Sequence, residues 1–134
     1  MNFKLLTPDR QVFSGEVNLV GSRTDNGSFS LLPRHIPAVM ELEPAALKIE
    51  SDEGQRKFVV QGGFLFKERD DTVRVLTREA KEFGELDPAE LRQEIEELEN
   101  ELEKIDKGED RGLYEQTRSE LERSRLSLRL IENE

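Results

Sequence analysis

The sequence predicts two parts of different fold class: a mainly β N-terminal sandwich or flattened barrel over residues 1–84, and a C-terminal antiparallel αα-hairpin over residues 85–134. Three observations lead to this division. Short apolar stretches separated by turn residues recur through the first part, as they do in sandwiches and barrels. Apolar residues in the second part recur at heptad spacing. Nearly all of the net negative charge also lies in the second part.

Strands are expected where apolar residues alternate with polar ones and a turn residue follows. Pro8 and Asp9 end the first such stretch, and the polar run from Ser51 to Gly54 separates two others. Proline and glycine favour turns because they supply the backbone angles that turns need. The expected strand residues are 3–5, 12–20, 29–31, 47–49, 58–60, 64–66 and 73–75.

Two further pairs of residues interrupt the strands of the first part. Gly62 and Gly63 are expected to form a bulge or a close backbone approach. They make a poor phosphate loop, because neither a Lys-Ser/Thr pair nor a helix follows them. Asp70 and Asp71 are expected to form a solvated hairpin turn.

Charge is unevenly divided. Of the net charge of −10, the first 84 residues carry −1 (12 Lys and Arg against 13 Asp and Glu) and the rest carry −9 (8 against 17). This balance disfavours nucleic acid and anionic membrane surfaces as partners, since both attract basic surfaces. The absence of cysteine excludes disulfides, thiolate nucleophiles and Cys-containing zinc sites. Without a signal-like N-terminus or an apolar run of ~18 residues, we expect a soluble protein that stays where it is made.

The second part begins with a helix start signal, in which Asp87 is the cap and Pro88 the first helical residue. The six residues from Lys107 to Gly112 then interrupt the periodicity, and so short a break favours an antiparallel return. The first apolar stripe is Leu91, Ile95, Leu98, Leu102 and Ile105. The second is Leu113, Tyr114, Thr117, Leu121, Leu128 and Ile131.

One apolar stripe per helix makes a thin core. Each buried apolar side chain contributes ~1.5–3 kcal/mol, whereas ordering each residue costs ~1–2 kcal/mol. The hairpin is therefore expected to rely on a second surface, either the first part or another protein. An element that can choose between two supports can act as a conformational switch.

Residues 27–37 read GSFSLLPRHIP and contain the one histidine of the chain, His35. Asn26 and Gly27 form a turn signal, and Pro33 and Pro37 stop any strand ladder or helix. The segment is therefore expected to be a short strand followed by a loop that presents its side chains.

This string resembles the hallmark G-E-F/L-G-I/L-L-P-x-H-x-P of the epsilon subunit of F-type ATP synthases. Other stretches similar to that family's pattern follow in the expected order: FSGEV at residues 13–17, GGFL at 62–65, and VRVL at 73–76 with Glu79 and Ala80 after it. The resemblance covers the whole first part. The arginine before the histidine makes this chain more similar to the alternate, often sodium-linked, bacterial F-type ATPases.

The resemblance implies a non-catalytic central-stalk subunit that links the gamma shaft to the c-ring of the membrane sector. Such a subunit supports the coupling of proton or sodium translocation to ATP synthesis, holds no cofactor, and lies peripherally on the cytoplasmic side of the cell membrane. The hairpin of such relatives is held to extend toward the alpha/beta catalytic head, where it restrains ATP hydrolysis.

Four residues of the first part are candidate interface residues. The resemblance places His35 against the gamma shaft, whereas the residues alone leave open a structural hydrogen bond, a general base or a metal ligand. Ser28 lies where many relatives have an acidic residue that faces the membrane ring. Asp25 or Arg34 can supply that contact instead.

Four arginines flank the apolar face of the second helix: Arg111, Arg118, Arg125 and Arg129. The plain interpretation pairs them across the hairpin with Glu94, Glu99 or Glu101. The resemblance implies instead that they regulate hydrolysis by meeting acidic loops of the catalytic subunits.

ATP binding is not expected. Some relatives bind ATP through the motif I/L-D-x-x-R-A at the start of the first helix. Here Leu86 and Asp87 match its opening, but Glu90 stands in place of the arginine. Arg92, two residues on, lies about 200° around the helix and is no simple substitute.

Two rival functions remain at this stage. The second part alone would suit a coiled-coil chaperone or adaptor. An acid/base hydrolase that uses Asp25, His35 and a further carboxylate is weaker, because local spacing brings no two of these groups together.

Overall fold

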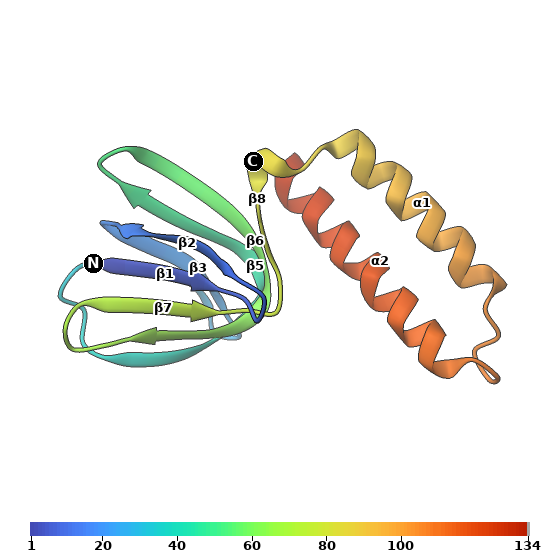
Figure 1. Ribbon diagram of the computed structural model, residues 1–134, viewed down its shortest axis with the longest axis horizontal. Helices are drawn as coiled ribbons and strands as arrows, with labels where there is room; N and C mark the ends of the chain where they lie inside the picture. Colours follow the sequence, from blue (N-terminus) through green and yellow to red (C-terminus); the bar gives the residue numbers. More distant parts are fainter. Residues whose placement is uncertain (134) are drawn as a thin grey trace. The chain divides into compact units, whose positions relative to one another are not determined.

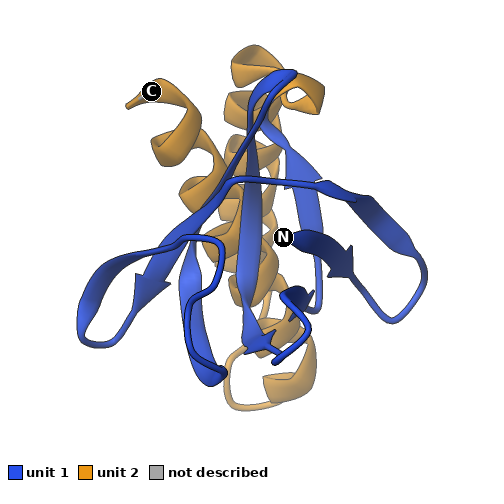
Figure 2. Cartoon of the chain, turned by 90° about the vertical axis from the view of Figure 1, so that its left-hand side faces the viewer, with its two compact units in different colours: residues 1–83 blue, residues 84–134 orange. Residues whose placement is uncertain are grey.

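The computed structural model describes residues 1–133, which form two compact units, residues 1–83 and the residues from 84 onward (Figure 2). The first unit holds the β-strands and the second holds two helices. No helix within the described residues is long and apolar enough to cross a membrane.

The first unit is built from strands of very different length. Most have three to six residues, whereas β5 and β6 have 14 each. In chain order the strands are β1 (Asn2–Leu6), β2 (Gln11–Glu16), β3 (Leu19–Thr24), β4 (Gly27–Leu31), β5 (Ala38–Ser51), β6 (Gly54–Lys67), β7 (Thr72–Leu76) and β8 (Ala80–Glu82).

These strands form an unclosed sheet in the order β2-β1-β7-β6-β5-β3-β4, with β8 paired to β6 (Figure 1). Among the strand pairs of the described residues, β1 and β7 are parallel and all the others are antiparallel. The long strand β6 pairs with β7 through residues 64–67 and with β8 through residues 58–60. The β5–β6 hairpin thus links the two layers of a β-sandwich, which confirms the predicted fold class.

The core lies between the two layers. Phe3 and Leu5 are completely buried, so the predicted alternation in the first strand is confirmed. Removing such side chains from water is the main stabilising term for this unit. Other members of the same cluster are Val20, Leu47, Ile49, Phe58, Val60, Leu65, Val73 and Val75.

Two features of the strand pattern differ from the prediction. The stretches expected at 58–60 and 64–66 belong to one continuous strand, and Pro44 lies inside β5. Proline is tolerated there because, among the described strand pairs, β3 pairs with β5 only at residues 48–50, so β5 has no second neighbouring strand at Pro44. Conversely, the stretch expected at 12–20 divides into β2 and β3.

The close backbone approach predicted at the double glycine is confirmed. Gly62 and Gly63 have φ angles of 82° and 124°, which favour glycine. A Cβ on Gly63 would overlap the carbonyl oxygen of Leu76. The two glycines lie where β6 passes from its pairing with β8, at residues 58–60, to its pairing with β7, at residues 64–67.

The second unit is the predicted hairpin of α1 (Pro88–Lys104) and α2 (Arg111–Glu132), preceded by a 3-10 turn at Phe83–Glu85. Asp87 caps α1 as expected, its Oδ1 accepting the Ala89 N–H at 2.9 Å. Buried residues at the expected spacing are Leu91, Leu98, Thr117 and Leu121.

One residue of the expected second stripe is placed wrongly by the prediction. Leu113 is 52% exposed. It lies one residue, or about 100°, away from the line through Tyr114 and Leu121 on α2. The buried stripe continues instead through Ser124.

Candidate functional site

Residues 27–37 comprise strand β4 and the segment that follows it. β4 pairs with β3, and the buried Leu31 anchors its end in the core. Gly27 has a φ of 116°, as the tight turn between the two strands requires. Residues 32–37, called the docking segment below, are all exposed.

The backbone of the docking segment is fixed at several points. The His35 N–H donates to the Leu32 carbonyl oxygen at 3.2 Å, which closes a turn. The φ of Arg34 is 70°, and its N–H donates to Asp71 Oδ1 at 3.1 Å. Pro33 and Pro37 add their own rigidity. The segment is therefore exposed but ordered.

The ring of His35 has a local hydrogen bond. Its Nδ1 lies 2.8 Å from the carbonyl oxygen of Ile36, a geometry that suits a proton on Nδ1. This is the structural hydrogen bond that the residues alone left open. Within residues 1–133, His35 joins no group of three His, Asp or Glu side chains that could hold a metal ion.

The other two candidate interface residues lie at the opposite end of β4. Ser28 Oγ accepts a long hydrogen bond of 3.4 Å from Arg23 Nη1, and Asp25 is exposed in the β3–β4 turn. The structure thus groups Asp25 with Ser28 at the start of β4, and Arg34 with His35 after its end. An acid/base pair of Asp25 and His35 gains no support from this arrangement.

Exposed apolar side chains lie in and beside the docking segment. Ile36 is 73% exposed, Val39 68% and Leu32 56%. Three large aliphatic side chains so close together in the chain, facing water, are typical of a surface that another protein covers. The candidate interface residues predicted from the sequence are polar or charged and do not include these apolar side chains.

The contacts of Asp71 differ from those of the solvated turn residue that the sequence predicts. Asp70 behaves as a turn residue, its Oδ1 accepting the Thr72 N–H at 3.1 Å. Asp71, however, is no merely solvated side chain, because its Oδ1 lies 3.0 Å from Nζ of Lys67. The side chain of Lys67 is only 1% exposed. The signal was available: Lys67 lies two residues after Leu65, on the inward face of β6.

These contacts change the acidity of Asp71. The hydrogen bond from Lys67, followed by that from the Arg34 N–H, holds the pKa of the Asp71 carboxyl below its ordinary value. The carboxylate is therefore charged at neutral pH and remains an acceptor for both donors.

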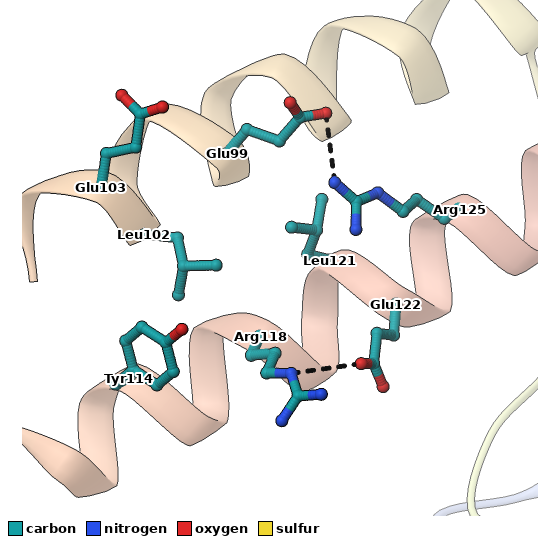
Figure 3. A pocket seen from close by; sticks show the side chains of 8 residues that line it. All are labelled: Glu99, Leu102, Glu103, Tyr114, Arg118, Leu121, Glu122 and Arg125. Carbon is teal, nitrogen blue, oxygen red and sulfur yellow. Dashed lines mark ion pairs between the residues drawn. The ribbon is translucent and has the colours of Figure 1, made fainter. Parts of the chain in front are cut away.

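In the hairpin, two of the four candidate arginines line a hollow of about 460 Å³ between α1 and α2 (Figure 3). Arg125 pairs with Glu99 across the hairpin at 3.5 Å, as the plain interpretation expected. Arg118 instead pairs with Glu122 on its own helix at 3.3 Å, so its expected partner was wrong. The lining residues are Glu99, Leu102, Glu103, Tyr114, Arg118, Leu121, Glu122 and Arg125.

The remaining two candidates, Arg111 and Arg129, are exposed on α2. Both ion pairs in the hollow are about half exposed, so each contributes only ~0.2–1 kcal/mol and can exchange partners at little cost. A polyanion such as ATP would meet three carboxylates in the hollow, which repel it.

Comparison with known proteins identifies the family. The family described as the ATP synthase delta/epsilon chain, β-sandwich domain, matches residues 1–83. The chain belongs to the ATP synthase delta/epsilon family. The ATP synthase epsilon chain of Mycobacterium avium is 34% identical over 98 residues, which cover 72% of this chain and 80% of that relative.

Other epsilon chains extend the similarity. That of Halalkalibacterium halodurans is 29% identical over 133 residues, covering 99% of this chain and 92% of the relative. With the epsilon chain of Nitrosococcus oceani the match, 29% identical, spans 64% of the relative's length. The resemblance to F-type epsilon subunits drawn from the sequence is thus confirmed.

The fold is similar to a chain in the mitochondrial ATP synthase structure of Euglena gracilis, described as OSCP/F1/c-ring. The TM-score is 0.66 and the identity 23%, over 97% of this chain and 76% of that chain. At this identity the likeness shows that the two chains share a fold.

Proposed function

We propose that this chain is a rotor subunit of the central stalk, which binds the gamma shaft and the c-ring through residues 25–37 and catalyses no reaction itself. The observation that carries the proposal is the docking segment. It is exposed over its whole length, yet two prolines and the Arg34–Asp71 hydrogen bond order it. A segment ordered in advance loses little conformational entropy when a partner binds.

The two ends of β4 suit two different partners. The docking segment combines the apolar Leu32 and Ile36 with the polar Arg34 and His35, a mixture typical of protein interfaces. We assign it to the gamma subunit. The β3–β4 turn at the other end is polar, and its Asp25 is assigned to the loops of the c-ring.

In this role the sandwich transmits torque between shaft and ring and supports coupling of ion flow to ATP synthesis. The chain then lies peripherally on the cytoplasmic side of the membrane. The hairpin adds regulation: in an extended state, Arg111, Arg118, Arg125 and Arg129 contact acidic loops of the alpha/beta head and restrain hydrolysis. Weak, exposed ion pairs in the compact hairpin make this exchange of partners inexpensive.

The test is the affinity of the purified chain for the gamma subunit, measured by calorimetry. Replacing Arg34 and His35 together with alanine is expected to weaken binding about tenfold, while the melting temperature stays nearly unchanged because both side chains are exposed. The matched control replaces two other exposed residues, Glu53 in the β5–β6 turn and Gln55 near the start of β6. Unaltered affinity of the Arg34/His35 variant would place the interface elsewhere. Capture of diverse unfolded proteins instead of gamma would support the chaperone alternative.

A further inference from the structure

Two residues of the first unit have an unusual backbone conformation and contact each other. Among residues 1–133, the non-glycine residues with positive φ are Arg34, at 70°, and Asp71, at 66°. The Arg34 N–H donates to the Asp71 side chain. Left-handed backbone is disfavoured for arginine, so the surrounding contacts must hold it in place.

The Asp71 carboxylate is held by a buried cation. Nζ of Lys67 lies 3.0 Å from Asp71 Oδ1, and it also donates to the carbonyl oxygen of Glu68 at 3.0 Å. A buried ammonium without a partner is costly, so these contacts are strongly favoured. Lys67 thereby fixes the position of Oδ1.

The backbone of Asp71 is held as well. Its N–H donates to the Glu68 carbonyl oxygen at 3.3 Å, and its own carbonyl oxygen accepts the Asn2 N–H at 3.1 Å. Asp71 is thus attached to β1 and to its own turn, while its side chain reaches the docking segment. The chain from Lys67 through Asp71 to Arg34 connects the core of the sandwich to an exposed loop.

We propose that Lys67 and Asp71 are positioning residues that hold Arg34 in its left-handed conformation and so order the docking segment before its protein partner binds. The inference rests on the proposed function of that segment. Without the Asp71 acceptor, Arg34 returns to ordinary backbone angles and the segment samples many conformations. Binding must then supply the ordering entropy.

A matched pair of double variants separates this role from simple stability. Lys67→Met with Asp71→Asn removes the buried charge but keeps a side-chain oxygen that can accept the Arg34 N–H. Lys67→Met with Asp71→Ala removes the same charge and the acceptor too. Both lose the ion pair, but alanine tolerates the φ of 66° at position 71 less well than asparagine, so the alanine double variant is expected to melt somewhat lower. Exchange at Arg34 is therefore compared with exchange at core amides of the same variant.

Two measurements on the full chain are needed. Amide hydrogen exchange of Arg34, followed by NMR in the isolated protein, should be about tenfold faster in the alanine double variant than in the asparagine one. Affinity for the purified gamma subunit should be about tenfold weaker in the alanine double variant, and within about threefold of wild type in the other. Equal Arg34 exchange in the two variants would overturn the proposal.

Affinity for the gamma subunit distinguishes a failure of the positioning role of Lys67 and Asp71 from a failure of the assignment of the docking segment to gamma. If gamma affinity is equal in both double variants although the Arg34/His35 alanine variant weakens it, the positioning role is overturned. If none of these variants changes gamma affinity while Arg34 exchange still differs, the positioning of the segment is supported. In that case it is the assignment of the segment to gamma that fails.

Discussion

The two units of this chain differ in how completely each buries its apolar residues. The sandwich contains side chains such as Phe3, Leu47 and Leu65 with no exposed area. In the hairpin the most buried apolar side chain is Leu121, at 2%, and the stripe includes the small polar residues Thr117 and Ser124. Charge differs too, −1 for residues 1–84 against −9 for the remainder.

One chain therefore combines a rigid element, the sandwich, with an adaptable one, the hairpin. A deep core keeps the sandwich folded whatever its partner does, which suits an assembly surface. A thin core with exposed ion pairs can be rebuilt against another surface at little cost, which suits a regulator.

The largest expected effect separates the cores of the two units. Phe58→Ala should lower the free energy of unfolding of the sandwich by about 3–5 kcal/mol, because it leaves a cavity in a fully packed core. Leu121→Ala should loosen the hairpin alone. The chain has one tyrosine, Tyr114 in α2, and no tryptophan, so tyrosine fluorescence reports on the hairpin. If either variant shifts the unfolding transitions seen by tyrosine fluorescence and by circular dichroism by the same amount, the sandwich and the hairpin unfold as a single cooperative unit, contrary to this prediction.

The next effect concerns the bend in β6. Gly63→Ala should destabilise the sandwich by at least about 1–3 kcal/mol, because its φ is positive and a Cβ would overlap the Leu76 carbonyl oxygen. Gly84→Ala is the matched control, since a Cβ there meets nothing within 4 Å. Urea unfolding measures both variants. Equal stability of the two would contradict the close approach.

A smaller effect is the pH dependence of the sandwich. Arg56 donates to both carboxylate oxygens of Glu82, at 2.6 and 2.8 Å, and so lowers the pKa of that carboxyl from its ordinary value of 4.5. A lowered folded-state pKa contributes stability above that ordinary value and loses it as the pH falls through the folded-state pKa. Arg56→Met should therefore reduce the loss of stability between pH 6 and pH 3, which thermal melts would detect. An unchanged pH profile would exclude this pair as its source.

The smallest effect is expected in the hairpin. Arg125→Ala removes the pair with Glu99, which is about half exposed, and should cost only ~0.2–1 kcal/mol. High salt should remove even this difference, because salt screens exposed pairs. The check is the tyrosine fluorescence transition at low and high salt. A cost of several kcal/mol would mean that the hairpin is not adaptable in the way proposed.

Much of this architecture follows from local sequence patterns. Alternation at Phe3 and Leu5, the cap at Asp87 and the double glycine at Gly62 each act over a few residues, and each was predicted correctly. The length of β5 and β6 was not, because β6 continues through Gly62 and Gly63, which read in the sequence as a break between two strands. Leu113 was misplaced because it was assigned to the stripe for its apolar character, although its sequence position puts it about 100° around α2 from Tyr114.

The candidate site was harder to predict. Residues 27–37 were found because prolines, a turn glycine and a histidine stand together in the chain. The Lys67–Asp71–Arg34 connection was missed, since it joins residues 37 positions apart through a buried ammonium. Such contacts depend on tertiary packing, which places the β6–β7 turn beside the segment after β4.

ATP hydrolysis by the purified enzyme shows whether the sandwich assembles and the hairpin regulates. The rate of hydrolysis is compared for enzyme assembled with three forms of this chain: the wild-type chain, a chain ending after Gly84, and a full-length chain with Arg118, Arg125 and Arg129 changed to glutamate. We predict that all three assemble, that hydrolysis rises in both altered forms, and that high salt raises the wild-type rate toward theirs. Equal rates in all three would contradict the regulatory role, and failure of the shortened chain to assemble would contradict the independence of the sandwich.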